Sequence, residues 1–173
     1  MPANILENPG AWFAAQPSSF HERQMDLALR EARKAADEGE VPMGCVIVRL
    51  RADGSTELVG KAHNGTEGLK DPTAHAEVLA IREAAAAVGE WRLAGCTLVV
   101  TLEPCAMCAG AIVLARVPRV VFGAWDEKAG ASGSVFDILR ERRLNHWVEV
   151  FPGVREEESA RLLWDFFGSK RNP

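Results

Sequence analysis

The chain lacks a long hydrophobic run. No apolar stretch in its 173 residues approaches the ~18 residues that a membrane-spanning helix needs. Its beginning also lacks a basic start followed by an apolar segment, so it does not have the form of a signal peptide. From both absences we expect a cytoplasmic protein without membrane contact.

Cysteine is scarce, and positive charge is not in excess. In a cytosolic chain of this size, four cysteines are more typical of a metal or catalytic site than of disulfides. The 20 Lys and Arg residues stand against 24 Asp and Glu, which gives a formal net charge of −4. Because nucleic-acid-binding proteins are more often basic, any RNA contact must come from a local basic patch.

What the chain does contain is enough apolar material for one ordinary domain. Its hydrophobic fraction is 47% and its charged fraction 25%, typical of a globular protein with its own core. Residues 1–18 are rich in Pro, Ala and Asn and are predicted to form a flexible N-terminal leader. Residues 19–173 are predicted to form the domain.

Residue patterns predict helices and strands in alternation. Ser19 and Glu22 have the spacing of a capping box, which predicts a helix over 20–38 that ends at Gly39. Further helices are predicted at 75–88, 104–115, 134–142 and 155–167, and strands at 41–50, 57–62, 97–101, 120–122 and 147–151. Such alternation is typical of an α/β fold with helices around one sheet. The helix 134–142 would connect the last two strands by a crossover, so these strands should be parallel.

Two short motifs carry the chemistry, His75-Ala76-Glu77 and Pro104-Cys105-Ala106-Met107-Cys108. Cysteines three apart at a helix start can face one point, because one helical turn takes about 3.6 residues. The helix N-terminus favours thiolates, and His75 from another helix start would add a nitrogen ligand. Three protein ligands and an open fourth position are typical of catalytic zinc, where bound water becomes a nucleophile near neutral pH.

Glu77 gives this predicted metal site a chemical purpose. It follows the ligand His75 by two residues, close enough to reach the zinc-bound water. It could take a proton from that water and pass it to a ring nitrogen and a leaving amine. A purely structural zinc would have no use for such a carboxylate.

Each half of the constellation alone has plainer explanations. A single Cys-x-x-Cys is often a redox pair, or half of a structural zinc site. Cys45 and Cys96 could complete such a site, but both sit among apolar residues and are better explained as core. Together, however, H-x-E followed by P-C-x-x-C is the signature of the zinc-dependent deaminases.

The resemblance extends from this signature to about residues 20–171. It rests on Glu40-Val41-Pro42 with Gly44, Asp71 to Glu77, Thr101 to Ala111, Arg119 to Ala124, Gly130 to Ser134, Leu144-Asn145-His146, and Asp165-Phe166-Phe167. In these segments the chain resembles the bacterial tRNA-specific adenosine deaminases, the TadA family. The ending Gly168-Ser169-Lys170-Arg171 departs from that family in being less basic.

The resemblance implies a fold, a reaction and a set of site residues. The fold would be the cytidine deaminase-like three-layer α/β/α sandwich with a five-stranded mixed sheet. The reaction would be hydrolytic deamination of the wobble adenosine to inosine in a tRNA anticodon stem-loop. One zinc ion per subunit would be held by His75, Cys105 and Cys108, with Glu77 as the catalytic proton shuttle. Contacts to the target nucleoside would come from Asn64, Val41 and Ala76. Contacts to the anticodon loop would come from Asp126, Lys128, Asn145, His146, Phe166, Phe167, Lys170 and Arg171.

Several of these positions also have ordinary structural explanations. Asn64 precedes Gly65 and could be a turn residue. Phe166 and Phe167 could belong to the core of the last helix, and Lys170 and Arg171 would suit a helix C-terminus. Trp125 occupies a position that varies among relatives and receives no role.

Two other functions stay open at this point. A deaminase of a free nucleobase, guanine or cytosine, would share the zinc signature but needs a closed pocket. A zinc-stabilised binding module without catalysis is disfavoured by Glu77 and the open ligand position.

The helix after Cys105 predicts a homodimer. Residues 106–115 present no charged or amide side chain on any face, and a helix that is apolar all round must be buried on all sides. The same helix of a second copy is the simplest cover, in a two-fold interface. The resemblance implies a homodimer too. The alternative is that the terminal helix 155–167 covers that face.

Overall fold

The computed structural model describes the backbone of residues 17–171 and the side chains of residues 19–169. The predicted leader therefore lies outside the described residues, apart from residues 17 and 18. These two already belong to the first described helix, α2 (Pro17–Asp37), which begins three residues before the predicted start. The leader stays a prediction.

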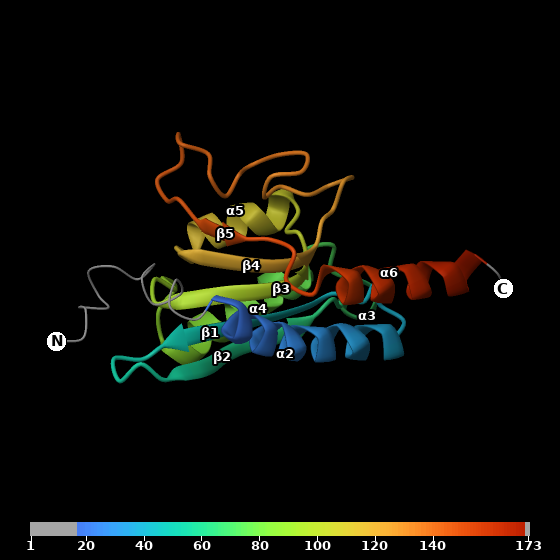
Figure 1. The fold of residues 1–173 in the computed structure, drawn as a ribbon, viewed down its shortest axis with the longest axis horizontal. Coiled ribbons are helices and arrows are strands. Elements are labelled where there is room, and N and C mark those ends of the chain that lie inside the picture. The colour runs from blue at the N-terminus through green and yellow to red at the C-terminus, as the bar shows by residue number, and fades with distance from the viewer. Residues whose placement is uncertain (1–16, 172–173) are drawn as a thin grey trace.

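One mixed sheet of five strands forms the centre of the molecule, in the order β2-β1-β3-β4-β5 (Figure 1). The strands are β1 (Gly44–Leu50), β2 (Thr56–His63), β3 (Cys96–Leu102), β4 (Arg119–Ala124) and β5 (Glu149–Phe151). Strand β1 is antiparallel to both neighbours, whereas β3, β4 and β5 are parallel. The predicted parallel pairing of the last two strands is thus confirmed.

Helices cover both faces of this sheet. The remaining elements are α3 (Thr66–Leu69), α4 (Ala76–Val88), α5 (Ala106–Leu114) and α6 (Glu156–Arg171). Helices α2 and α6 lie on one face, and α4 and α5 on the other (Figure 1). This confirms the predicted three-layer α/β/α sandwich.

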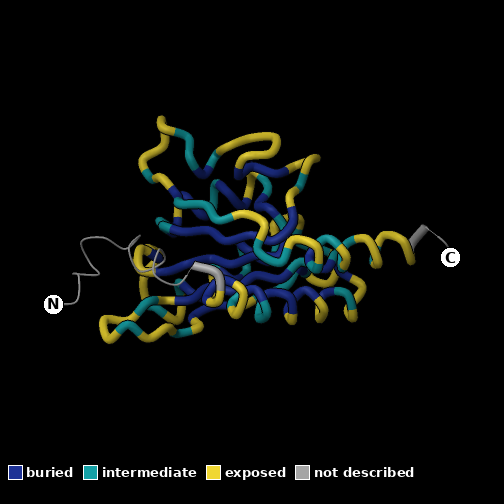
Figure 2. The backbone as a smooth tube through the Cα atoms, viewed as in Figure 1, coloured by how far each residue is buried: buried dark blue, intermediate teal, exposed yellow. Residues whose placement is uncertain are grey.

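Strand alternation divides the core into two layers. In β3, Leu98 and Val100 pack with α4 and α5, while Val99 between them packs with α2. Successive side chains of a strand point to opposite faces, so a strand covered on both faces is apolar throughout. Figure 2 shows the inner strands β1, β3 and β4 among the most deeply buried parts of the chain.

Glycine lets α2 lie unusually close to the sheet. A Cβ atom on Gly44 would stand 2.0 Å from the backbone oxygen of Ala28 and 2.4 Å from the backbone nitrogen of Ala32. Backbone cannot retreat as a flexible side chain can, so only glycine fits at the start of β1.

The predicted helix at 134–142 is wrong. Residues 125–148 form turns with isolated bridges and pass on the side of α5 as a long connection (Figure 1). The backbone amides of Ser132 and Ser134 donate to the Glu103 carboxylate at 2.9 and 3.1 Å, and Gly133 has a φ of 136°. Within the predicted range, the amide of Ile138 donates to the carbonyl oxygen of Ala131 at 3.0 Å, seven positions earlier instead of four, so helical hydrogen bonding is not formed.

Helix α6 is joined to the sandwich mainly through its first half. Glu158 pairs with Arg33 of α2 at 2.6 Å. Arg155, directly before α6, pairs with Asp26 of α2. The second half projects beyond the sheet (Figure 1) and is largely exposed (Figure 2). None of the described helices combines the length and apolar character needed to cross a membrane.

Candidate active site

Three metal-binding side chains meet where two helices begin. His75 and Cys105 are the N-cap residues of α4 and α5, both extended, and neither side chain caps its own helix. Cys108 lies one turn into α5. The sulfur atoms of Cys105 and Cys108 lie 3.7 and 3.5 Å from His75 Nδ1. The ligand atoms of all three residues lie within 4.8 Å of one another, the one such group in residues 17–171.

The two cysteines behave as a pair. A hydrogen bond with Cys108 lowers the pKa of Cys105 to about 4, while the same bond and burial raise the pKa of Cys108. Near neutral pH, Cys105 is therefore a thiolate, and Cys108 keeps its proton. A thiolate at the positive end of a helix is a strong ligand for a soft or borderline cation.

Glu77 is buried against this group. Its residue is 0% exposed, and neither carboxylate oxygen has a hydrogen-bond partner. Burial raises its pKa to about 7, and the charge of Cys105 acts in the same direction. A fully buried carboxylate without partners is rare in native proteins and calls for a ligand.

The donor set and this carboxylate fit a zinc ion. One imidazole and two thiols supply three ligands of the types that zinc prefers, and the described residues bring no fourth to them. Besides burial, the pKa of Glu77 is shifted by Cys105, His75 and Cys108, so its carboxylate lies near all three groups and could act on water that a bound metal would supply.

The other two cysteines belong to the core, as predicted. Cys45 is 0% and Cys96 2% exposed, both within the larger hydrophobic cluster. Burial raises the pKa of the Cys96 thiol to about 11 and that of Cys45 well above its usual value. Neither lies in the group with His75.

Asn64 is placed beside the metal-binding segment. Its backbone amide donates to Met43 at 3.0 Å, and the next amide, Gly65, donates to Ala74 at 3.0 Å. Its side-chain Nδ2 donates to the buried carboxylate of Glu40 at 3.0 Å, and its Oδ1 accepts a hydrogen bond from the Thr66 hydroxyl at 3.3 Å. Asn64 therefore has a tertiary contact, to Glu40, in addition to the local contact that a turn residue would have.

The two other predicted pocket residues are both at least half-buried. Ala76 is fully buried between His75 and Glu77, and Val41 is half-buried in the segment that leads into β1. Sequence reasoning missed Glu40, which holds Asn64, although its acidic side chain before an apolar strand was a visible signal.

A second missed residue, Glu103, organises the loop on the other side of the metal group. It is 1% exposed and accepts the backbone amides of Asp126, Ser132 and Ser134 at 2.9 to 3.1 Å. The same loop bridges Gly130 to Cys105. Asp126 and Lys128 are thereby held at the edge of the sheet where the metal ligands lie.

Other predicted RNA contacts lie elsewhere. The Arg116 guanidinium donates to Asn145 Oδ1 at 2.6 Å, and His146 Nε2 lies 2.8 Å from the Val117 carbonyl oxygen. Both sit past the C-terminal end of α5, whose nine residues separate them by roughly 13 Å from Cys105. Within one chain, the structure does not bring them to the metal group.

The remaining candidates are on α6. Phe166 is half-buried and Phe167 is 46% exposed, with ring centroids 5.4 Å apart. Lys170 and Arg171 lie in the last turn of the helix, and their side chains are outside the described residues.

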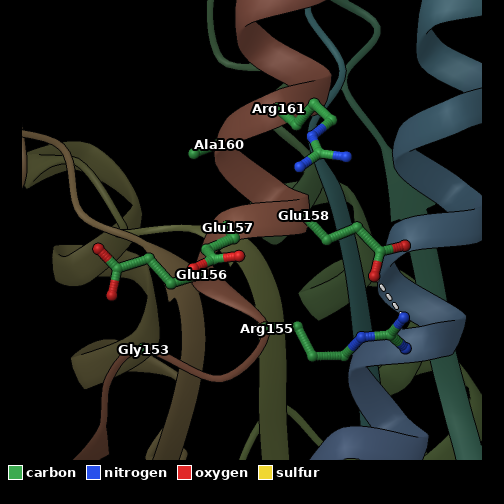
Figure 3. A pocket seen from close by; sticks show the side chains of 7 residues that line it. All are labelled: Gly153, Arg155, Glu156, Glu157, Glu158, Ala160 and Arg161. Carbon is green, nitrogen blue, oxygen red and sulfur yellow. Dashed lines mark hydrogen bonds and ion pairs between the residues drawn. The ribbon is translucent and has the colours of Figure 1, made fainter.

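A broad hollow of about 1000 Å³ opens at the start of α6 (Figure 3). Charged side chains from residues 155–161 line it, and Arg155 is paired with Glu158. None of the predicted site residues takes part, so this hollow is separate from the metal group.

Comparison with known families defines the class of the protein. A family profile described as the cytidine and deoxycytidylate deaminase zinc-binding region matches residues 18–124. This range contains His75, Cys105, Cys108 and Glu77. Together with the three-layer fold, the match defines a cytidine deaminase-like zinc deaminase.

More similar relatives narrow the family. The chain is 51% identical over 150 residues to the tRNA-specific adenosine deaminase of Bacillus subtilis, covering 87% of this chain and 90% of the relative. It is 50% identical over 150 residues to the enzyme of the same name from Aquifex aeolicus, covering 86% and 94%. The chain thus belongs to the tRNA-specific adenosine deaminase family.

Among the solved structures as well, a tRNA deaminase is more similar to the chain than a guanine deaminase is. A structure from a study of A-to-I editing by tRNA:A34 deaminases has a TM-score of 0.75 at 45% identity, covering 82% of this chain and 99% of that one. The guanine deaminase from Bacillus subtilis has a TM-score of 0.57 at 30% identity, covering 88% and 94%.

Proposed function

We propose that the protein hydrolyses adenosine to inosine at the wobble position of a tRNA anticodon loop in the cytoplasm. The observation that carries this proposal is the buried, unpartnered Glu77 beside the His75, Cys105 and Cys108 group. That group lies in a chain 50–51% identical to proteins named tRNA-specific adenosine deaminase.

His75, Cys105 and Cys108 would hold one zinc ion per chain. When bound, the ion would polarise a water molecule so that it loses a proton near neutral pH. Metal analysis of the purified protein should give a ratio of one zinc per chain, and a substitution of any of the three residues should abolish that binding.

Glu77 moves the protons of the reaction. Its carboxylate takes the proton from water and gives it to the ring nitrogen as the water oxygen bonds to C6 of adenine. The carbon–nitrogen bond to the exocyclic amine then breaks, and Glu77 delivers a further proton from the added hydroxyl to the departing amine. The products are inosine and ammonia, and Glu77 ends as it began.

Asn64, Val41 and Ala76 form the wall on which the nucleoside rests. Glu40 accepts from the Nδ2 of Asn64 and the Thr66 hydroxyl donates to its Oδ1, so the side-chain amide is held in one orientation. Asp126, Lys128, Phe166, Phe167, Lys170 and Arg171 contact the loop around it. A looped-out nucleotide is required, since a base within a stem cannot reach a buried site.

A homodimer completes the proposal. Met107 and Leu114 of α5 are 36% and 70% exposed, and the half-buried Gly110 and Ala111 lie between them on the same face. Helix α6 does not cover this face, because it packs on the opposite side of the sheet. In a two-fold dimer built on α5, Asn145 and His146 would serve the site of the other copy.

The decisive experiment compares substrates. A tRNA anticodon stem-loop with adenosine at the wobble position should be converted to inosine, and the same stem-loop with guanosine there should be inert. Free guanine and cytosine are assayed in parallel by ammonia release. If a free base is deaminated and the RNA is left unchanged, the alternative function, a deaminase of a free nucleobase, is favoured.

A further inference from the structure

Glu103 lies between a metal ligand and the loop that follows β4. It is 1% exposed and stands two residues before Cys105 in the chain. Its Oε1 accepts the backbone amides of Ser132 and Ser134 at 2.9 and 3.1 Å. Its Oε2 accepts the backbone amide of Asp126 at 3.0 Å. One buried carboxylate therefore fixes both ends of this loop.

The loop in turn holds the backbone of the metal ligand. Gly130 and Cys105 form an antiparallel bridge. Beside it, the backbone amide of Ala131 donates to the carbonyl oxygen of Pro104 at 2.8 Å. Cys105 is the N-cap residue of α5, and its side chain makes no capping hydrogen bond to that helix. The place of its sulfur atom is therefore set by backbone that the loop supports.

The loop approaches the carboxylate so closely that a side chain at Gly130 would not fit. A Cβ atom there would stand 2.2 Å from Glu103 Oε2 and 2.4 Å from Glu103 Cδ. These distances are far below van der Waals contact, so the backbone of Gly130 lies directly against the carboxylate. The Ser134 hydroxyl closes the loop by donating to the Asp126 carbonyl oxygen at 2.8 Å. Glu103, Gly130 and Cys105 are thus joined in one series of contacts.

We propose that Glu103 is a positioning residue of the metal site, which acts through residues 126–134 and holds Cys105 in place to bind zinc. Residues behind the ligands of a metal fix the orientation of those ligands, and changing one typically lowers metal affinity about 10- to 100-fold. Here the support acts on the backbone of the ligand. The inference rests on the metal site of the proposed function and does not depend on the RNA substrate.

The first test measures the zinc affinity of the reduced, full-length protein by competition with a chromogenic chelator. Glu103→Gln keeps the size of the side chain but replaces one acceptor oxygen by a donor, which leaves at least one loop amide without its partner. Its zinc affinity should fall about 10- to 100-fold. Glu127→Gln, at an exposed position in the same loop, should bind zinc as the parent does.

A second substitution breaks the same contact from the other side. Gly130→Ala should also weaken zinc binding, because its methyl group displaces the carboxylate. Glu103→Ala makes room for that methyl group, so adding Gly130→Ala to Glu103→Ala should cause little further loss. Gly95→Ala is the matched control, since a Cβ atom at that position has open space around it. If Glu103→Gln does not fold, the comparison of the two glycine variants decides.

Cobalt in place of zinc gives a readout that a general loss of stability would not change. The absorption band from charge transfer between thiolate sulfur and cobalt depends on the geometry of the bonds to the metal. It should shift in Glu103→Gln and stay unchanged in Glu127→Gln. Parental zinc affinity in Glu103→Gln and Gly130→Ala, an unshifted cobalt band, or losses that add fully in the double variant would overturn the proposal.

Failure of the metal site itself has a different signature. The parent protein would then bind no zinc, and the proposed function would fail with it. Failure of the positioning role alone leaves a parent that binds zinc and deaminates RNA, while Glu103→Gln has the zinc affinity of the parent.

Discussion

The buried carboxylate of Glu40 accepts a 3.0 Å hydrogen bond from the side-chain amide of Asn64. Its other oxygen accepts the backbone amide of Gly68 at 2.7 Å. One carboxylate thus ties the end of β2 to the short helix α3 and sets the orientation of the amide that we assign to the nucleoside.

Replacing Glu40 by Ala should therefore raise KM for RNA more than it lowers kcat. A group that binds the substrate and the transition state equally well raises KM when it is lost and leaves kcat nearly unchanged. The buried side-chain amide of Asn64, left without this acceptor, should also cost about 1–3 kcal/mol in the free energy of unfolding, whereas the amide of the exposed Gly68 can be solvated. Steady-state kinetics and urea unfolding measure both. Glu67→Ala, an exposed acidic position on α3, is the control. A wild-type KM in Glu40→Ala, with a large effect of Asn64→Ala, would contradict the positioning role.

Glu77→Ala should keep zinc and fold but lose turnover by at least about 10²- to 10⁴-fold, the usual contribution of general acid–base catalysis. Single-turnover assays and metal analysis on the same preparation measure both quantities. Substantial activity would refute the proton-transfer role, and loss of zinc would show that Glu77 is a ligand instead.

The surface of α5 gives a test of the dimer. Leu114→Arg should convert a particle of twice 18.8 kDa into one of 18.8 kDa at micromolar concentration, because Leu114 is 70% exposed in one chain. Light scattering or sedimentation decides this. Leu69→Arg, at an exposed position on α3, should leave the dimer intact. Ile112 is unsuitable, because it is 0% exposed and a charge there disrupts the core. A wild type that is monomeric at this concentration ends the dimer proposal.

The pH dependence of the free energy of unfolding should come in part from His21. Burial lowers its pKa to about 4, and the charge of Arg119 acts in the same direction. Since the unfolded imidazole titrates near 6.5, folding excludes a proton between these values, and stability is lost as the pH falls from 6.5 towards 4. This difference between the folded and unfolded pKa values of His21 corresponds to at most about 3 kcal/mol in the free energy of unfolding. Urea unfolding across this range should give a shallower slope for His21→Phe, and equal slopes would contradict the prediction.

Local rules were enough to predict that the two thiols of the proposed metal site lie together. Helix starts and the spacing of Cys105 and Cys108 place the thiols together, and the signature adds His75 from a second helix start. The layers of the fold were equally accessible, since each strand and helix that builds them has its own pattern. The thiol pair and the layers depend on residues close in sequence, whereas His75 lies 30 positions before Cys105 and was found through the family signature.

The loop at 134–142 and the role of Glu40 depend on distant residues. Glu103 captures amides about 30 positions away, which no local pattern announces, and so a helix-like sequence becomes a series of turns. Glu40 acts through Asn64, 24 positions later. Carboxylates that serve backbone and side-chain donors across the fold are the features that sequence reasoning missed.

The two outer strands of the sheet have a consequence for aggregation. An outer strand offers unpaired backbone groups to any other extended chain, and proteins limit this with short strands, charges and bulges. At one side β5 has only three residues. At the other, β2 carries Glu57 and Lys61, and its pairing with β1 is interrupted by an irregularity at Ile47 and Val48. Neither border is long, flat and apolar, so the sheet is a poor template for fibril growth.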